Sequence, residues 1–231
     1  MTKLPPQLSI GVPAGAIAPA AMAVAPYWAW PWIAAAALYA LFLSHYQNWR
    51  GPLTQAEVDD VLKTIQPKND PDGFRAFLET DDGGEFFMLN LMLFPDGKIA
   101  HPDTGAPIEP RTLVQSYSRP FIKQLLLHGG HPTLLMMRHG GDVDSWGSTA
   151  ESGAQWGVTN VMRYRSRRDL ANMAAMSAFA GIHQFKRAAI LENISYPNKM
   201  MMTGFAGPRL FMATALILAA ALGNLVILAL S

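Results

Sequence analysis

The chain has 231 residues, of which 50% are hydrophobic and only 15% are charged, and it contains no cysteine. The absence of cysteine excludes disulfides, thiolate catalysis and cysteine-ligated metal sites. The 18 basic and 17 acidic residues nearly cancel and form no basic run, which excludes electrostatic binding of nucleic acid as a leading function.

Charge is unevenly distributed along the chain. Asp, Glu, Lys and Arg are absent from residues 4–49 and 210–231, whereas residues 51–199 contain 15 basic and 17 acidic residues and have a formal charge of −2. This pattern predicts a soluble domain between two membrane-like ends. The expected organisation is an N-terminal apolar segment (1–50), a helical lead-in (51–84), an α+β domain (85–198) and a transmembrane helix (210–230).

The N-terminal apolar segment is expected to contain a transmembrane helix near residues 28–46. Aromatic residues favour the two water interfaces of a bilayer. Here they lie at both ends of the stretch, with Trp28 to Trp32 at one end and Tyr46 and Trp49 at the other. The stretch between them therefore fits a membrane span.

Residues 8–25 are also uncharged, but Pro13 and Pro19 interrupt them. A peripheral or re-entrant segment is favoured here, and a third membrane span is the alternative. Because the small residues at 23–25 resemble a signal-peptide cleavage site, removal of this segment is a further alternative, although its basic start is only Lys3.

The C-terminal stretch 210–230 is uncharged and rich in Leu, Ala and Ile. At about 1.5 Å per residue it reaches roughly 32 Å, enough to cross a hydrocarbon core of about 30 Å. Ala215, Ala219 and Gly223 recur at every fourth position and predict a face on which a helix of a partner membrane protein can pack.

Basic residues flank both predicted spans on the side of the central domain, whereas only Lys3 lies on the far side. The positive-inside rule then places the central domain in the cytoplasm and the chain in the cell (inner) membrane. With two spans, both termini lie outside.

The lead-in is expected to hold two short helices. Thr54 and Glu57 form a capping box that predicts a helix over residues 55–65. Asp70 followed by Pro71 predicts the start of a second helix, which ends at Gly83-Gly84.

A strand is predicted over residues 85–94, and it is apolar on both faces. Helices of the same chain can cover only one of these faces, so the other is expected to meet a second sheet. The simplest source of that sheet is a second copy of the chain, which predicts a homodimer.

The remaining pattern alternates between strands and helices and gives the order β-α-β-β-α-β, the ferredoxin-like motif. The helix after the first strand is expected to kink or restart at Pro120 and to end at Gly129-Gly130. A capping box at Ser166 and Asp169 opens the second helix. The elements are a loop at 95–110, a helix at 111–128, a strand at 131–139, a loop at 140–157, a strand at 158–165, a helix at 166–189 and a strand at 191–196.

Several segments resemble the dimeric α+β barrel superfamily, and most closely its uncharacterised branches and the antibiotic-biosynthesis monooxygenase type. The resemblance covers about residues 54–197 and implies two four-stranded sheets packed face to face. Relatives include haem enzymes, cofactor-free monooxygenases, isomerases and proteins without known activity, so the resemblance implies no single reaction or cofactor. The segments are Asp81-Asp82-Gly83, Phe87-Met88-Leu89-Asn90-Leu91, the run from Tyr164 to Leu170, and Ile182-His183 with Lys186, Ala188-Ala189 and Leu191-Glu192.

Two residues are candidates for a site in the apolar interior. Asn90 is the polar residue in the centre of an apolar strand face, so it either positions a ligand or bonds Tyr117 or a backbone group. His183 lies on the last helix of the domain. The resemblance implies that a helix histidine there can be an axial haem ligand, and the alternative is a packing residue.

Arg163 is a third candidate, because Arg138, Arg163 and Arg165 alternate with apolar neighbours on predicted strands. They could hold a carboxylate or an anionic lipid head group, or form ion pairs with Glu192 or Asp142.

No metal site is predicted, because the spacing of the candidate ligands matches no zinc signature. The candidates are His128, His131, His139, Asp142 and Asp144. Trp146 and Trp156, in the long loop, either contact a partner or a membrane surface or fold over the end of the barrel.

These observations leave two functions. The favoured one is a membrane-anchored dimeric barrel that acts as a binding or interaction module, or as an accessory subunit of a membrane complex. The alternative is an oxidoreductase or isomerase acting on a small hydrophobic substrate, with or without haem, that uses Asn90, Arg163 and His183. The sequence contains no Ser/His/Asp signature, phosphate-binding glycine loop or dinucleotide fingerprint.

Overall fold

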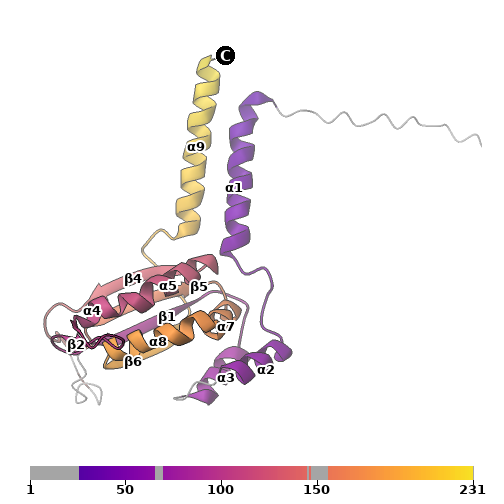
Figure 1. Cartoon of the computed structure of the whole chain (residues 1–231). Coiled ribbons are helices and arrows are strands. Elements are labelled where there is room, and N and C mark those ends of the chain that lie inside the picture. Colours follow the sequence, from indigo (N-terminus) through magenta and orange to yellow (C-terminus); the bar gives the residue numbers. More distant parts are fainter. Residues whose placement is uncertain (1–25, 66–69, 145, 147–155, 231) are drawn as a thin grey trace, which may run out of the picture.

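A computed structural model describes residues 26–65, 70–144, 146 and 156–230. An α+β domain lies at one end, and two long helices rise from it side by side (Figure 1). The domain is built on a four-stranded antiparallel sheet with the strand order β4-β5-β1-β6. Its strands are β1 (Phe86–Leu93), β4 (His131–Met137), β5 (Val158–Tyr164) and β6 (Glu192–Asn198).

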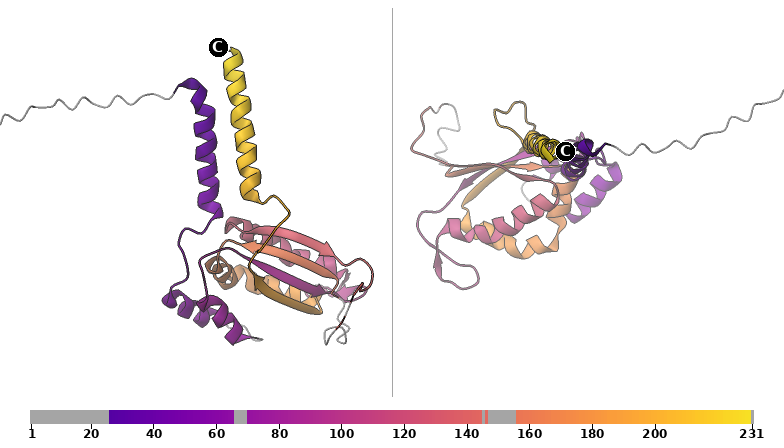
Figure 2. Two further views of the ribbon diagram at one scale, coloured as in Figure 1. Left: turned by 180° about the vertical axis from the view of Figure 1, so that it is seen from behind. Right: turned by 90° about the horizontal axis from the view of Figure 1, so that it is seen from above.

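Helices cover one face of this sheet (Figures 1 and 2). Strands and helices alternate along the chain in the predicted order, because each helix carries an apolar stripe that packs onto the sheet. A short hairpin, β2 (Ile99–Ala100) with β3 (Pro107–Ile108), interrupts the predicted loop. The covering helices are α4 (Pro110–Leu113), α5 (Gln115–Leu127), α7 (Arg167–Ala175) and α8 (Ser177–Ala189).

The helix does not restart at Pro120, which was one of the two alternatives predicted there. The first covering helix restarts at Val114, and α5 runs through Pro120 without interruption. Proline removes the N–H that would bond the carbonyl four residues earlier, here Ser116. Both residues are exposed, so water can satisfy that carbonyl and the helix tolerates the proline.

The predicted end of α5 is confirmed. Gly129 has φ +73°, a left-handed conformation that favours glycine. A Cβ at this position would also lie 2.6 Å from the carbonyl oxygen of His45, so the turn presses against the end of the first long helix.

The second covering helix differs from the prediction, because Met176 adopts an extended conformation and divides it into α7 and α8.

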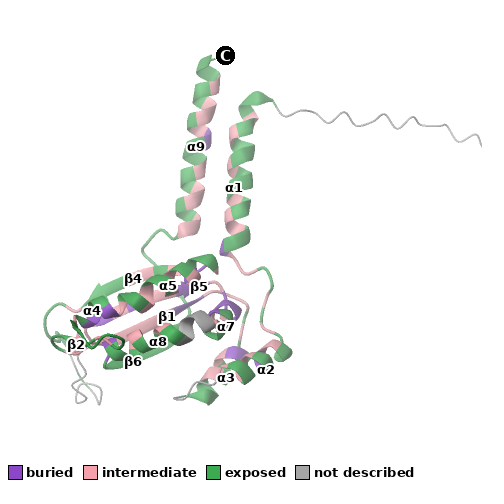
Figure 3. Ribbon diagram, in the orientation of Figure 1, coloured by how far each residue is buried: buried purple, intermediate pink, exposed green. Residues whose placement is uncertain are grey.

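The core lies between the sheet and these helices. Its largest cluster stacks Phe86 on Tyr164, with ring centroids 5.0 Å apart, against Leu125 and Met173. A second cluster joins Leu113 to Ala189 and Ile190 at the other end of the helix layer. Burial falls off toward the edge strand β6, which is exposed throughout (Figure 3).

The opposite face of the sheet is apolar, and no described helix covers it (Figure 2, left). Alternation along the strands places Leu89, Leu91 and Val161 on this face, with Ile194 of the edge strand 46% exposed. The strand β1 is therefore apolar on both faces, as predicted, and only one of the two is covered within the chain.

The lead-in forms α2 (Gln55–Thr64) and α3 (Pro71–Glu79), and the capping box at Thr54 and Glu57 is confirmed. Arg168 of α7 also pairs with Glu57, at 2.8 Å between Nε and Oε1. Together the capping box and this pair hold the pKa of Glu57 down, to about 2. The lead-in is thus attached to the domain through the start of α7.

The two long helices are α1 (Trp30–Tyr46), preceded by the 3-10 turn η1 (Tyr27–Ala29), and α9 (Pro208–Leu230). They pack against each other, with Ala220 buried and Gly223 against Pro31. Ala215 and Ala219 are exposed, so the two alanines and Gly223 do not share one free face. Their lengths and mean hydropathies of 1.2 and 2.3 would suit membrane spans.

Candidate functional site

A cavity of about 1260 Å³ lies between the covered face of the sheet and helices α5 and α8. It exceeds the 300–1,000 Å³ of typical small-molecule sites. Apolar side chains from the sheet and helices make up most of its lining, and methionine is prominent among them. Because methionine is flexible and polarisable, such a wall can adapt to ligands of irregular shape. The methionines are Met88, Met92, Met137, Met162 and Met173.

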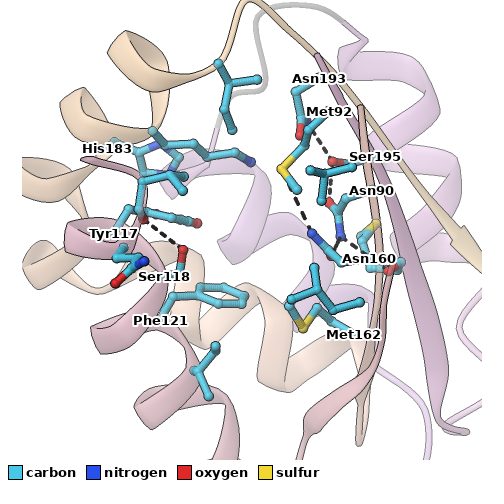
Figure 4. Close-up of a pocket in the computed structure, with 18 of the residues that line it drawn as sticks. Asn90, Met92, Tyr117, Ser118, Phe121, Asn160, Met162, His183, Asn193 and Ser195 are labelled. Atoms are coloured by element: carbon cyan, nitrogen blue, oxygen red, sulfur yellow. Dashed lines mark hydrogen bonds between the residues drawn. The ribbon is translucent and has the colours of Figure 1, made fainter. Parts of the chain in front are cut away.

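A row of polar side chains crosses the cavity floor over three neighbouring strands (Figure 4). We call it the amide row, and it consists of Asn193, Ser195, Asn90 and Asn160. Asn193 donates to Ser195 at 2.8 Å, and Ser195 donates to Asn90 Oδ1 at 2.6 Å. Asn90 Nδ2 in turn donates to Asn160 Oδ1 at 2.8 Å. The row runs from the exposed edge strand to the centre of the sheet.

Asn160, at the inner end of the row, is only 8% exposed. Its Nδ2 faces the sulfur of Met92 at 3.9 Å, and a thioether is a weak acceptor. The row therefore presents a poorly satisfied amide donor to the cavity. A ligand oxygen would accept this hydrogen bond better than the sulfur does. Asn90 also donates to the carbonyl of Met88 at 3.3 Å, so one of the two alternatives predicted for it, a backbone bond, is present.

Three titratable side chains line the helical wall opposite the amide row, namely Tyr117, His183 and Lys186. The rings of Tyr117 and His183 have centroids 5.2 Å apart, and Lys186 Nζ lies 5.7 Å from the centroid of Tyr117. Burial raises the pKa of Tyr117 to about 12 and lowers the pKa of Lys186. Burial lowers the pKa of His183 too, and Lys186 and Arg187 lower it further. Neutral tyrosine and neutral imidazole are therefore the favoured forms near pH 7.

Some of the exposed residues that line the cavity are apolar, and they mark one of its openings. Leu135 and Met137 of β4 are 73% and 60% exposed, although both belong to the cavity wall. As the strand order requires, β4 is an edge strand, and it lies on the side of the domain from which α1 and α9 rise (Figure 1). An apolar opening thus faces the two long helices.

Arg163 does not belong to this cavity. It precedes Tyr164 in β5, so its side chain lies on the opposite face of the sheet from Asn160. It is 1% exposed, donates to Glu85 at 2.8 Å and to the carbonyl of Tyr46 at 3.0 Å, and lies 3.7 Å above the Tyr46 ring. The structure thus brings Asn90 and His183 to one cavity and places Arg163 elsewhere.

We call the group around Arg163 the helix joint, and it consists of Tyr46, Glu85, Arg163 and Arg209. Arg209, in the first turn of α9, pairs with Glu85 at 2.7 Å and lies 4.9 Å from the Tyr46 ring. Burial alone would raise the pKa of Glu85, but hydrogen bonds and charges from Arg209 and Arg163 hold it below its usual value. The joint ties both long helices to the sheet.

The three arginines considered for a shared anion have separate carboxylate partners. Arg138 pairs with Asp142 at 2.8 Å, one of the two partners expected, although the two residues are four apart along the chain; Arg165 pairs with Asp169. Arg163 pairs with Glu85, not with Glu192. Glu192 begins the exposed edge strand, whereas Glu85 directly precedes the strand that pairs with β5.

The histidines considered for a metal have other contacts. His128 Nδ1 bonds the carbonyl of Gln124 at the end of α5, and His131 Nε2 bonds the Tyr46 hydroxyl at 2.9 Å. Within residues 26–65, 70–144, 146 and 156–230, no three His, Asp or Glu side chains are grouped as metal ligands. Trp146 is exposed, and most of its loop lies outside the described residues.

Sequence reasoning identified Asn90 and His183 but missed Asn160, Ser195 and Lys186. Asn160 was detectable in principle, because it is the polar residue on the inward side of its predicted strand, as Asn90 is on the neighbouring one. Their pairing depends on strand register, which a single sequence does not provide. Lys186 lies one helical turn after His183, and that spacing could have placed both on one wall.

Comparison with known proteins gives a structural similarity and no activity. No family model matches the chain, and no curated protein matches it significantly. Two crystal structures of RPA0582 are similar, one described as a protein of unknown function from Rhodopseudomonas palustris and the other as the methylated protein. The methylated protein is 19% identical over 61% of this chain and 97% of its own, and the other is 18% identical over 60% and 98%. Both have a TM-score of 0.47.

Proposed function

We propose that this chain is a membrane-anchored binding protein whose α+β domain holds a small, largely apolar ligand in the cavity. The observation that carries this proposal is the combination of a large, methionine-rich cavity with the amide row on its floor. Ligand sites of proteins typically join an apolar lining to a few placed polar groups that fix orientation.

The anchor consists of α1 and α9. Each is long and apolar enough to cross a bilayer, and they rise from the same side of the domain (Figure 1). Arg50 and Arg209 flank the two helices on the domain side. By the positive-inside rule the cavity then lies in the cytoplasm, next to the inner surface of the cell membrane. Ala215 and Ala219 are exposed on α9 and available to a helix of a partner subunit.

The domain is proposed to form a ferredoxin-like dimeric barrel through the uncovered face of its sheet. That face is apolar, and burying it against an identical face would remove its leucines from water. Seen along α1 and α9, the strands overlap in a narrow band with the covering helices on one side (Figure 2, right). The sheet therefore stands roughly parallel to the long helices. A two-fold axis parallel to α1 and α9 would place two such sheets face to face. The α1 and α9 helices of both chains would then lie in the same membrane.

The dimer is tested by a charge in the middle of the uncovered face. Val161→Lys is expected to yield monomers, measured as the mass of the protein in detergent, because the lysine would lie between the two sheets. Thr112→Lys, at an exposed position of α4, is the matched control and should leave the mass unchanged. A Val161→Lys protein with the mass of the native assembly would disprove pairing through this face.

Ligand binding is tested by placing a bulky side chain in the cavity. Ser118 lines it, whereas Ser116 on the same helix is exposed and outside it. The full chain in phosphatidylcholine nanodiscs is irradiated with a photoreactive hexadecanol, and labelled residues are mapped by mass spectrometry. Labelling of cavity residues near position 118 should be reduced in Ser118→Trp and unchanged in Ser116→Trp. Equal labelling in both variants would contradict a ligand in the cavity.

A second candidate function is catalysis on the bound ligand, as an oxidoreductase or isomerase. The observation that favours it is the approach of Tyr117, His183 and Lys186 to one another opposite the amide row. A neutral imidazole can accept a proton near neutral pH, and burial lowers the pKa of the neighbouring Lys186. His183→Ala and Asn90→Ala should then abolish turnover without changing the mass of the assembly.

Haem is the cofactor that the family resemblance suggests for such an enzyme. His183 fits an axial ligand in two respects, since it lines the cavity and its neutral form is favoured. Bound haem would supply one-electron or oxygen chemistry. A Soret absorption band in the purified protein that disappears in His183→Ala would support this candidate, and a colourless native protein would count against it.

A further inference from the structure

The charged residues that line the cavity carry one sign. Among the described residues that line it, four are lysine or arginine, and none is aspartate or glutamate. Residues 51–199 as a whole carry a formal charge of −2, so this excess of cations does not follow from composition. A site lined in this way favours a ligand with negative charge. The cations are Arg111, Arg119, Lys186 and Arg187.

Ion pairing separates these cations from the other arginines of the chain. Eight of the eleven arginines form an ion pair with a described carboxylate, and none of those eight lines the cavity. No such pair joins Arg111, Arg119 or Arg187 to any described acidic residue, and all three line the cavity. Arg111 instead faces the Phe94 ring at 5.9 Å, and Arg119 donates to Gln115. The cavity wall thus holds cations whose charge is not neutralised by the described part of the chain.

Lys186 shows the same property deeper in the wall. Its described contact is the face of Tyr117, and no described carboxylate lies within 4 Å of its ammonium group. An ammonium group beside an apolar cavity has lost water without gaining a counterion, which is unfavourable for the charged form. A negatively charged ligand group placed next to Lys186 would supply that counterion.

The polar and apolar parts of the cavity lie in different places. His183 on α8 lies across the cavity from the amide row, whose Ser195 and Asn193 belong to the edge strand β6 (Figure 4), and Lys186 lines the cavity one helical turn after His183. At the opposite edge of the sheet, Leu135 and Met137 of β4 form the exposed apolar mouth. A ligand that satisfies both ends has a charged head and an apolar chain. The mouth lies on the side of the long helices, where such a molecule would leave the bilayer (Figure 1).

We propose that the cavity binds a single-chain amphiphile with an anionic head group, a carboxylate or a phosphate, and admits it from the membrane between β4 and α5. This inference rests on the proposed function and names its ligand class. The head group lies between Lys186, Arg187 and the amide row, and the chain extends along the methionines toward Leu135.

The test compares head groups on one chain length. The full chain in phosphatidylcholine nanodiscs is labelled with photoreactive hexadecanol while unlabelled hexadecanoate, hexadecyl phosphate or hexadecanol competes. We expect an anionic competitor to displace the label at a concentration about tenfold or more below that of the alcohol, the ratio of one charge-assisted hydrogen bond. The anion with the lower displacing concentration identifies the head group.

Substitutions of the cations locate the head group. Lys186→Gln and Arg187→Gln should each raise the displacing concentration of the anionic competitor about tenfold. The displacing concentration of the alcohol should stay unchanged. Lys123→Gln and Arg75→Gln, at exposed positions outside the cavity, are the matched controls and should change neither. Because Arg187 is exposed, its substitution tests the proposal even where Lys186→Gln fails to fold.

Entry from the membrane is tested at the mouth. Leu135→Glu should slow the displacement of label by membrane-dissolved hexadecanoate, because it places a carboxylate in the path of the anionic head. Leu127→Glu is the matched control, since Leu127 is equally exposed on α5 but does not line the cavity. Equal rates in the two variants would overturn this route.

The outcomes separate this inference from the proposal on which it rests. Equal displacement by the acid, the phosphate and the alcohol, unaffected by Lys186→Gln and Arg187→Gln, would overturn the anionic head group and leave a neutral ligand in the cavity. Absence of cavity labelling by the hexadecanol probe in the native protein would overturn the binding function as well.

Discussion

The helix joint and the cavity wall use the same cationic side chains in opposite ways. At the joint, Arg163 and Arg209 share the carboxylate of Glu85 and lie over the ring of Tyr46. On the cavity wall, Lys186 and Arg187 have no described carboxylate partner. The charges of Arg163 and Arg209, which attach the long helices to the sheet, are neutralised by a carboxylate of the same chain. The charges of Lys186 and Arg187 are available to a negatively charged ligand.

The two regions are connected through the central strands. Glu85 precedes β1, which carries Asn90, and Arg163 lies in β5 with Asn160. The joint therefore fixes α1 and α9 to the strands whose opposite faces form the cavity floor. A ligand that displaces the amide row acts on the same two strands to which the membrane helices are attached.

The largest effect is expected at the joint. Arg163→Met leaves Glu85 partly buried beside fewer cations, and breaking a buried pair in this way costs about 3–5 kcal/mol. Chemical unfolding of the protein in detergent should show this loss. Arg75→Met removes an exposed pair with Glu79 and should cost less than about 1 kcal/mol. Equal losses for the two variants would contradict the structural role of the joint.

The amide row should come second. Asn160→Leu leaves Asn90 Nδ2 with only its longer bond to the carbonyl of Met88 and should cost about 1–3 kcal/mol in unfolding free energy. The double variant Asn90→Leu with Asn160→Leu should cost less than the sum of the two single changes, because neither amide is then left unsatisfied. Thr159→Val, on the uncovered face, is the control. Strict additivity in the double variant would show that the two amides do not interact.

A smaller effect is expected at the lead-in, and it depends on pH. The pKa of Glu57 is lowered to about 2 by its bonds to Arg168 and Thr54. Its stabilising contribution is therefore complete above about pH 4.5, the ordinary value, and is lost as the pH falls toward 2. Glu57→Gln should cost about 1 kcal/mol at pH 7 and less at pH 3. A cost that does not change between these pH values would contradict the depressed pKa.

The smallest effect on stability is expected on the cavity wall. Arg187→Gln should change the unfolding free energy by no more than about 0.5 kcal/mol, because its guanidinium group has no described partner to lose. The same substitution should weaken the binding of an anionic amphiphile. A destabilisation as large as that of Arg163→Met would show that Arg187 is structural and would remove the distinction between the two groups of cations.

Local signals predicted most of the fold. The capping box at Thr54, the N-cap at Ser166 and the glycine at 129 depend on neighbouring residues only, and all three are confirmed. The restart predicted as one alternative at Pro120 does not occur, because the effect of a helix proline depends on whether water reaches the freed carbonyl of Ser116. That exposure is a property of the folded domain and not of the local sequence.

The site was less predictable, because its contacts join distant segments. Asn90 meets Asn160 only through the register of β1 against β5, and Glu85 meets Arg209 across 124 residues. The alternation of Arg163 and Tyr164 indicated that they face opposite sides, but not which side the helices cover. The cation pattern of the cavity emerges only when the partners of all the arginines are known.

Native mass spectrometry of the protein released gently from its own membrane tests the central claim most directly. We predict a native protein that carries one small acidic lipid per chain, a Ser118→Trp variant in which the lipid-bound fraction is reduced, and a Ser116→Trp variant in which it is unchanged. A lipid mass that persists undiminished in Ser118→Trp would place the ligand outside the cavity and contradict the account.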